Sequence, residues 1–284
     1  MIIAVTVDDV RRQVKEWKKE GLSVGLVPTM GALHEGHASL VDSSVKVCDR
    51  TVASVFVNPT QFSKGEDLDS YPRTFDRDCE ILEEHGCDMV FAPTVDVMYP
   101  EGFGTEIQIT TGIVNRLCGA SRPGHFKGVC TVVGKLFNIV SPDSAFFGEK
   151  DAQQLAVIRK MVKDLNFDIE IIGCPIVREE DGLAKSSRNT YLNAEERKAA
   201  LCLSRSVAKG QEIIKNGMKA EKLLGEMTEV INAEPLAKID YVSVVDALTM
   251  EPVEKIERPV LVAMAVYIGK TRLIDNFSWE PAEQ

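Results

Sequence analysis

The sequence predicts an α/β protein, with a parallel sheet in its amino-terminal part and a smaller α+β region after it. Up to about residue 174, short apolar runs alternate with segments of helical periodicity, as expected of a parallel sheet with right-handed crossovers. Beyond that point, helical segments rich in Glu, Lys and Ala precede a group of strand-like runs. We therefore expect two domains, residues 1–174 and residues 175–284, and a lid role for the second.

Apolar runs of strand length provide the expected strands of the first domain. They are residues 22–27, 51–57, 88–93 and 144–147, and the alternating segment 167–172 is a further expected strand. Helical spacing of apolar side chains marks residues 10–19, 38–45, 75–85, 129–140 and 152–161. Residues 94–121 contain many glycines, and we interpret them as a loop-rich excursion with one added strand at residues 106–110.

Beyond Tyr191 the second domain has few concentrated catalytic residues. Its expected helices are residues 194–217 and 220–232, and its expected strands are residues 240–245, 260–268 and 272–274.

Composition limits the classes of function. The 284 residues can bury a core without disulfides, and 44% apolar with 27% charged residues is typical of a globular protein. A net charge of −10 argues against a broad nucleic-acid surface. Seven irregularly spaced cysteines without C-x-x-C fit a reducing compartment. Without a signal peptide or a membrane-spanning run, we expect a cytoplasmic protein that does not contact a membrane.

A glycine-bearing turn after residues 22–27 is the feature around which we expect the site to form. In open α/β sheets, ligands bind outside the carboxyl ends of the strands. Gly31 and Gly36 lack a Cβ and allow close approach of a ligand, and exposed N–H groups at a helix start attract anions. His34 and His37 are three residues apart on one helical face, from which imidazoles can donate to phosphate oxygens.

Two other interpretations of His34 and His37 stay open at this stage. The spacing H-E-G-H differs from the H-E-x-x-H of zinc proteases, and no third ligand is evident nearby, which disfavours zinc. An isolated pair with this spacing would most often be two surface histidines. Here the pair occupies a glycine-rich turn between a strand and a helix, which disfavours that interpretation.

Further polar loops follow expected strands or open expected helices. Asn58 and Gln61 follow residues 51–57, where we favour substrate contact over ordinary loop chemistry. The segment with Arg122, His125 and Lys127 is bounded by Pro and Gly, which suggests an anion pocket.

Two loops later in the chain combine cations with small polar residues. Lys150 follows Gly148 and is suited to phosphate, while Asp151 is a candidate helix cap or metal contact. Lys185 and Arg188 flank two serines, a mixture that favours a triphosphate clamp over a flexible basic loop.

Five separated segments, in order along the chain, closely resemble the pantoate–β-alanine ligase (pantothenate synthetase) family. They are P-T-M-G-A-L-H-E-G-H, V-F-V-N-P-T-Q-F, R-P-G-H-F-x-G-V, F-G-E-K-D-A-Q-Q and K-S-S-R-N. H-E-G-H alone would indicate only the wider superfamily of HIGH-type nucleotidyltransferases and class I aminoacyl-tRNA synthetases. The added segments make the resemblance specific.

The resemblance implies a Rossmann-like amino-terminal domain, a smaller carboxyl-terminal domain and a cytoplasmic homodimer. It implies ATP-dependent condensation of (R)-pantoate with β-alanine, with Mg²⁺ accompanying ATP. The carboxylate of pantoate attacks the α-phosphorus and pyrophosphate leaves; the amine of β-alanine then attacks the bound pantoyl adenylate and AMP leaves. Adenylation gives the carboxylate a good leaving group, so the protein's task is positioning and charge stabilisation.

The motifs also imply roles for individual residues. ATP would be bound by Met30, Gly31, Ala32, Leu33, His34, Glu35, Gly36, His37, Gly148, Glu149, Lys150, Asp151, Val177 (through its backbone), Lys185, Ser186, Ser187 and Arg188. The catalytic candidates are His34, His37 (the nominated proton donor), Lys150 and Arg188, and Asp151 would face the metal. Pantoate would contact Gln61, Gln154 and Asn58, and β-alanine would contact Gln61. Additional candidates are Tyr71, Arg122 and His125.

One departure and two alternatives qualify this assignment. Many relatives have Met before S-S-R where this chain has Lys185, so a backbone role there does not automatically become a side-chain role. A nucleotidyltransferase that releases its nucleotidyl product would have no amine-dependent step. A regulatory nucleotide-binding protein with a vestigial site is disfavoured by the intact His34, His37, Lys150 and Arg188.

Overall fold

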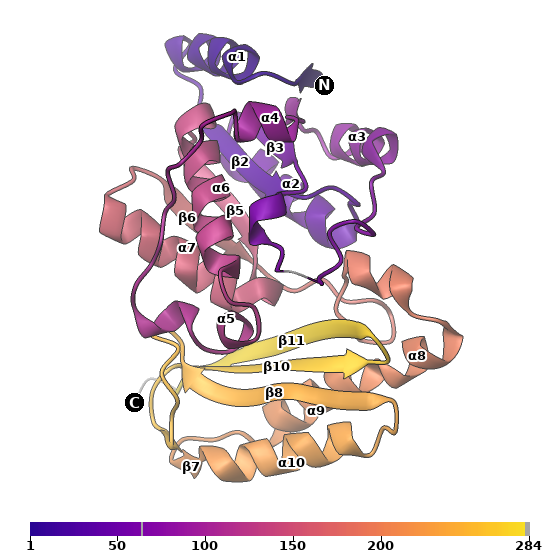
Figure 1. The fold of residues 1–284 in the computed structure, drawn as a ribbon. Helices are drawn as coiled ribbons and strands as arrows, with labels where there is room; N and C mark the ends of the chain where they lie inside the picture. Colours follow the sequence, from indigo (N-terminus) through magenta and orange to yellow (C-terminus); the bar gives the residue numbers. More distant parts are fainter. Residues whose placement is uncertain (64, 282–284) are drawn as a thin grey trace. The chain divides into compact units, whose positions relative to one another are not determined.

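The computed structural model describes residues 1–63 and 65–281, which form two compact units (Figure 1). The first unit comprises Met1–Thr110, Arg122–Glu149 and Val157–Pro175. The second comprises Thr111–Ser121, Lys150–Ala156 and the described residues from Ile176 onward. The last change of unit along the chain, after Pro175, lies next to the domain boundary expected after residue 174. The earlier segments that belong to the second unit, Thr111–Ser121 and Lys150–Ala156, were not expected.

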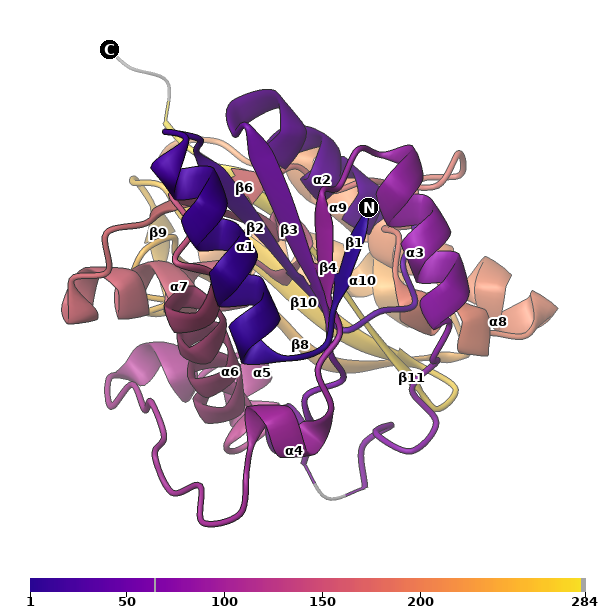
Figure 2. The same cartoon turned by 90° about the horizontal axis from the view of Figure 1, so that it is seen from above.

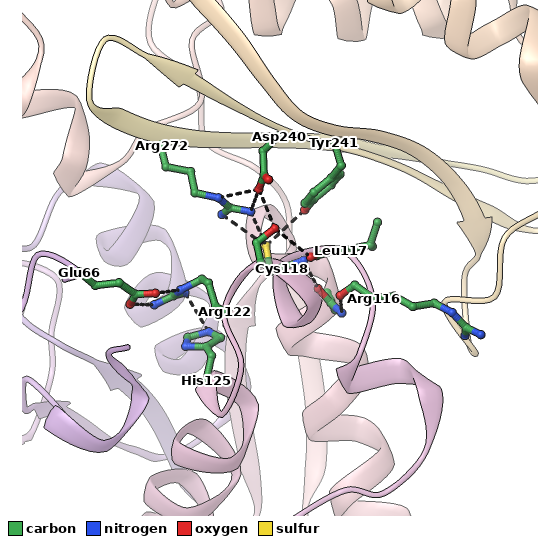
Figure 3. A network of polar contacts seen from close by, with 11 residues as sticks. Glu66, Arg116, Leu117, Cys118, Arg122, His125, Asp240, Tyr241 and Arg272 are labelled. Carbon is green, nitrogen blue, oxygen red and sulfur yellow. Dashed lines mark hydrogen bonds and ion pairs between the residues drawn. The ribbon is translucent and has the colours of Figure 1, made fainter. Parts of the chain in front are cut away.

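Polar contacts explain why Thr111–Ser121 belongs to the second unit. The side-chain amide of Gln153 donates to two carbonyl oxygens of this segment and accepts the N–H of Cys118. The sulfur of Cys118 lies 3.2 Å from the hydroxyl of Tyr241 and 3.6 Å from two guanidinium nitrogens of Arg272 (Figure 3). These partners are far away in sequence, so local patterns could not reveal them.

A parallel sheet forms the core of the first unit, as the sequence predicts. Its strands lie in the order β1-β4-β3-β2-β5-β6, with parallel pairings throughout. They are β1 (Ile2–Ala4), β2 (Val24–Thr29), β3 (Arg50–Val55), β4 (Met89–Phe91), β5 (Ser144–Gly148) and β6 (Glu170–Cys174). The direction of strand addition reverses between β2 and β5, and ligands in such sheets bind at the carboxyl ends of these strands.

Helices cover both faces of this sheet. Figure 2 shows α1 (Val7–Lys19) and α6 (His125–Val140) on one face, and α2 (Glu35–Val47) and α3 (Phe75–Glu84) on the other. Coverage on both sides explains why the central strands are almost continuously apolar rather than alternating. The sequence pattern of unbroken apolar runs was therefore a correct guide to this architecture.

The second unit contains an antiparallel sheet in the order β11-β10-β8. Its strands are β8 (Ala237–Asp246), β10 (Val260–Ile268) and β11 (Thr271–Trp279). The helices α9 (Leu201–Ile213) and α10 (Ala220–Asn232) share one hydrophobic core with them, to which Leu203, Met227, Val262 and Met264 contribute. The expected α/β class with a smaller α+β part is confirmed.

The remaining elements are short, apart from α7. They are α4 (Val95–Met98), α5 (Cys118–Ser121), α7 (Ala152–Leu165), α8 (Ala194–Ala199), β7 (Met218–Lys219), β9 (Lys255–Ile256) and the 3₁₀ turns η1 (Pro59–Gln61), η2 (Gly112–Val114), η3 (Glu149–Asp151) and η4 (Ser187–Tyr191). Among the described helices, none combines the length and the apolar character needed to cross a membrane.

Two predicted elements are wrong. Residues 106–110 form no strand; Ile107 instead donates its N–H to the hydroxyl of Thr131 and packs its side chain where a Cβ at Gly134 would collide with it. The helix expected over residues 194–217 is divided at Ala200 into α8 and α9. At residues 106–110, contacts with a helix of the same unit override the local pattern.

Candidate active site

The turn after β2 is organised around a buried carboxylate, that of Asp78 in α3. Asp78 is only 1% exposed and accepts hydrogen bonds from the N–H groups of Ala32 (3.0 Å) and Leu33 (2.8 Å). Gly31 has a φ of +81° and Ala32 a φ of +51°, and a Cβ at Gly31 would lie 2.9 Å from an oxygen of Asp78. The turn therefore wraps tightly around this carboxylate, and glycine is needed at position 31.

This arrangement corrects one expectation about the turn. The N–H groups of Ala32 and Leu33 bond to Asp78, and the N–H of Gly36 bonds to His34. The prediction that exposed N–H groups here bind an anion is wrong for these three groups. Asp78 was missed, although a carboxylate on the same helical face as buried Leu82, four residues later, is a detectable signal.

The two histidines face one another, as their spacing predicts. Their ring centroids lie 4.1 Å apart. Nδ1 of His34 accepts the N–H of Gly36 at 3.1 Å, and Nδ1 of His37 accepts the N–H of His34 at 3.3 Å. A ring nitrogen that accepts cannot carry a hydrogen, so each neutral imidazole has its hydrogen on Nε2. Both distal nitrogens are thus hydrogen-bond donors.

The loop after β3 fixes the side chain of Gln61. Asn58, itself 1% exposed, donates Nδ2 to Oε1 of Gln61 (3.1 Å) and to the carbonyl of Gly128 (3.2 Å). Its Oδ1 accepts the hydroxyl of Tyr99 at 2.7 Å. Nε2 of Gln61 lies 3.1 Å from the sulfur of Met30 in the turn after β2. The amide of Asn58 is fully engaged, while that of Gln61 retains hydrogen-bonding capacity.

The anion pocket expected at Arg122 and His125 is occupied by a carboxylate of the protein. Arg122 donates two hydrogen bonds of 2.7 Å to Glu66, and its third nitrogen lies 3.1 Å from Nε2 of His125 (Figure 3). Nδ1 of His125 donates to the carbonyl of Gln61 at 2.9 Å. Burial alone would raise the pKa of Glu66, but the hydrogen bonds and charge of Arg122 lower it below its ordinary value.

Two other residues of interest in the first unit also have protein partners. Lys127 forms an ion pair of 2.8 Å with Glu106, so the structure gives it a local partner rather than a place in the expected pocket. Tyr71 is buried, with its ring edge against Phe62 at a centroid distance of 6.1 Å.

In the second unit, the segment after β5 begins with Lys150. Asn276 of β11 donates its Nδ2 to the backbone carbonyl of Lys150 at 2.8 Å. The ammonium of Lys150 lies 3.9 Å from a carboxylate oxygen of Asp151. The side-chain amide of Gln153 is engaged by Thr111–Ser121, whereas that of its neighbour Gln154 forms no hydrogen bond within residues 1–63 and 65–281.

The Lys185–Arg188 loop follows a small hairpin in the second unit. Arg178 and Ala184 form an antiparallel bridge, and the N–H of Lys185 donates to the carbonyl of Val177 at 2.9 Å. The hydroxyl oxygen of Ser186 accepts the N–H of Arg188 and caps η4. The loop is therefore held at both ends.

No group of three or more His, Cys, Asp or Glu side chains among residues 1–63 and 65–281 is arranged to hold a metal ion. Mg²⁺ needs no such cage, because it is commonly held by one or two carboxylates together with substrate phosphates. Asp151, beside a lysine suited to phosphate, fits that requirement.

Comparison with known proteins decides the family. Residues 2–278 match the sequence model of pantoate-beta-alanine ligases. The chain belongs to the pantoate–β-alanine ligase family. It is 58% identical to the pantothenate synthetase of Ruminiclostridium cellulolyticum, covering 97% of this chain and 98% of that one. It is 59% identical to the enzyme of Enterococcus faecalis, covering 99% of each.

Solved structures of this family have the same fold. The pantothenate synthetase of Thermus thermophilus matches with a TM-score of 0.93 and 44% identity, covering 98% of this chain and 99% of that chain. The ligase of Francisella tularensis, crystallised with Beta-gamma ATP and Beta-alanine, matches with a TM-score of 0.78 and 36% identity, covering 98% and 97%. The predicted family, fold and ligase activity are confirmed.

Proposed function

We propose that this pantoate–β-alanine ligase activates pantoate through the paired imidazoles at the carboxyl end of β2. The supporting observation is that both Nδ1 atoms accept backbone N–H groups, which places the hydrogen of each neutral ring on Nε2. Donors that are oriented before the reaction stabilise the charge that develops on the α-phosphate. In this proposal Met30–His37 bind ATP, and His37 provides the donated hydrogen.

Gln61 holds pantoate in this proposal. Its Oε1 and Nε2 are oriented by Asn58 and by the sulfur of Met30, a weak acceptor that a substrate oxygen can replace at little cost. Amides at Gln61 and Gln154 bind pantoate without adding positive charge, so its carboxylate remains nucleophilic. Asn58, expected from the sequence to touch pantoate, becomes a positioning residue for Gln61.

The cationic loops would hold the leaving phosphates. Lys150, with Gly148 and Glu149 before it, and Lys185 to Arg188 supply ammonium, guanidinium and hydroxyl donors for the pyrophosphate part of ATP. The carbonyl of Val177 is engaged with Lys185, so its N–H would contact adenine. Asp151 would hold Mg²⁺ with the phosphates, and the ion supplies charge neutralisation there.

The bond changes are balanced by the substrates alone. An oxygen of the pantoate carboxylate bonds to the α-phosphorus as the bond to pyrophosphate breaks. The nitrogen of β-alanine then bonds to the acyl carbon as the bond to AMP breaks, and the amine gives up a proton. Gln61 would also contact β-alanine, a substrate present in the F. tularensis complex.

The test is exchange of labelled pyrophosphate into ATP with pantoate and Mg²⁺ present and β-alanine absent. We expect exchange that depends on pantoate, since adenylation is reversible while the adenylate stays bound. The matched control omits pantoate. If no exchange occurs but pantothenate forms once β-alanine is added, the reaction is concerted or pyrophosphate stays bound until the amine binds. Absence of both activities would contradict the proposal as a whole.

On the family resemblance we also propose that the chain acts as a homodimer in the cytoplasm. Sedimentation velocity of the purified chain tests the first point, and fractionation of the source cells tests the second. A single species with the mass of one 31.3 kDa chain would contradict the dimer.

A further inference from the structure

Two consecutive residues of β11 bond to two segments of the second unit: the hairpin that leads into Lys185–Arg188, and Lys150. Asp275 and Asn276 lie near the carboxyl end of the chain, and both are buried. Successive residues of a strand point to opposite faces. Neither residue belongs to a motif that was recognised in the sequence.

Asp275 holds the hairpin that leads into Lys185–Arg188. Its two carboxylate oxygens accept hydrogen bonds of 2.7 and 2.9 Å from the two terminal nitrogens of Arg178, and Asp275 is 1% exposed. The same guanidinium donates to the carbonyl of Gly182 at 3.0 Å, across the turn of the hairpin. The charge of Arg178 is therefore neutralised and its guanidinium is oriented, so Arg178 links β11 to the hairpin rather than binding phosphate.

Asn276 holds the other loop. Its Nδ2 donates to the backbone carbonyl of Lys150 at 2.8 Å. This bond fixes the backbone of Lys150, and therefore the position of its Cα, without engaging the ammonium group of its side chain. The N–H of Asn276 also donates to Asp275 at 2.8 Å, so the two tethers are joined.

We propose that Asp275 and Asn276 are a pair of positioning residues that fix Lys150 and the Lys185–Arg188 loop in the register needed to hold pyrophosphate. The inference rests on the phosphate roles assigned above to those two loops. A multiply charged leaving group needs cations at fixed separations, and a displacement of about 1 Å can cost about 100-fold in rate. One rigid strand that ties down both loops supplies that fixed separation.

The test compares the two half-reactions in variants of the tethers. Asn276→Ala removes the tether to Lys150, and Asp275→Asn weakens the tether to Arg178. We expect each to slow pyrophosphate exchange by ~10- to 100-fold and to raise the KM for ATP, with the KM for pantoate changed by less than ~2-fold. Transfer of the pantoyl group from preformed adenylate to β-alanine releases AMP, not pyrophosphate, so its rate should change by less than ~3-fold.

Asp240→Asn is the matched control. Asp240 also pairs with an arginine on this sheet, Arg272, and accepts the hydroxyl of Ser121; both of these partners lie outside the two loops. We expect it to leave both half-reactions near the rates of the unmodified enzyme. If Asp275→Asn fails to fold, Arg178→Lys keeps the charge and loses the two-pronged geometry, and should give the same selective loss.

The outcomes separate this inference from the function on which it rests. Equal losses in both half-reactions, or tether variants that behave like Asp240→Asn, would overturn the positioning role. Arg188→Ala tests the loop itself. If Arg188→Ala slows exchange but the tether variants do not, only the tether inference fails; if Arg188→Ala leaves exchange intact, the phosphate role of the loop fails with it.

Discussion

The imidazole of His37 is held at Nδ1 by the backbone N–H of His34, so its chemistry depends on the distal nitrogen. The backbone thus sets the position of the hydrogen before any substrate binds. His34 is held in the same way by Gly36. At this scale, the side chains were predictable from the motif, but their tautomers were not, since these depend on which backbone groups reach the rings.

Replacing His37 tests whether the hydrogen on its Nε2 is the one that matters for the reaction. His37→Ala should reduce pyrophosphate exchange by ~10²- to 10³-fold, the usual cost of removing a transition-state donor. Gln places an amide N–H near the position of Nε2, whereas Asn reaches only the position of Nδ1. His37→Gln should therefore retain more exchange than His37→Asn, with circular dichroism confirming that both are folded. Equal activity of the two variants would contradict a role for the distal nitrogen.

The pair of Glu66 and Arg122 gives a prediction about pH. Arg122 lowers the pKa of Glu66 below its ordinary 4.5, so the folded state binds this proton less readily than the unfolded state. The stabilisation is complete above pH 4.5 and is lost as the pH falls through the lower pKa of the folded protein. The difference in free energy of unfolding between the wild type and Glu66→Gln should therefore narrow below pH 4.5.

Urea unfolding of both proteins between neutral and acidic pH measures this difference. Glu101→Gln, at an exposed position of the same unit, is the control for the loss of one carboxylate. If the difference in free energy of unfolding between the wild type and Glu66→Gln stays constant or widens on acidification, the pKa of Glu66 is not lowered in the folded state.

At the scale of elements, the turn between β2 and α2 depends on α3. Asp78 in α3 accepts the N–H groups of Ala32 and Leu33 and the hydroxyl of Thr74. The sequence predicted both helices and the turn because their patterns are local. It did not predict the partner of the turn, because Asp78 is 45 residues from Leu33 and a carboxylate carries no mark of what it binds.

Asp78→Asn tests this dependence. The two N–H groups bond to different oxygens of the carboxylate, and an amide has only one oxygen. Its NH₂ would therefore face one of the N–H groups, and we expect a loss of about 2 kcal/mol in the free energy of unfolding. Because the turn carries His34, exchange should fall as well. Asp76→Asn, on the exposed side of the same helix, should leave both quantities unchanged. Full exchange in a destabilised Asp78→Asn protein would limit Asp78 to a structural role.

Local sequence patterns predict the structure of the first unit better than the composition of the second unit. The parallel sheet and its crossovers follow from apolar runs, so the class of fold was accessible from local pattern. The family was accessible from the five motif segments that resemble pantoate–β-alanine ligases. The assignment of Thr111–Ser121 and Lys150–Ala156 to the second unit was not, because it depends on contacts distant in sequence, such as Cys118 with Tyr241 and Lys150 with Asn276. The lid role of the second domain stays a prediction.

Net charge is a property of the whole molecule that bears on its substrate. At −10, the protein repels ATP at long range, which is why we propose that binding depends on local cations and on neutralisation by Mg²⁺. Chelation of Mg²⁺ with EDTA should abolish pyrophosphate exchange, and excess Mg²⁺ should restore it. Asp151→Asn removes one negative ligand and should raise the Mg²⁺ concentration needed for half-maximal exchange by ~10-fold, with the rate recovered at saturation. Exchange that persists in EDTA would contradict the requirement for the ion, and an unchanged Mg²⁺ dependence in Asp151→Asn would contradict the assignment of Asp151.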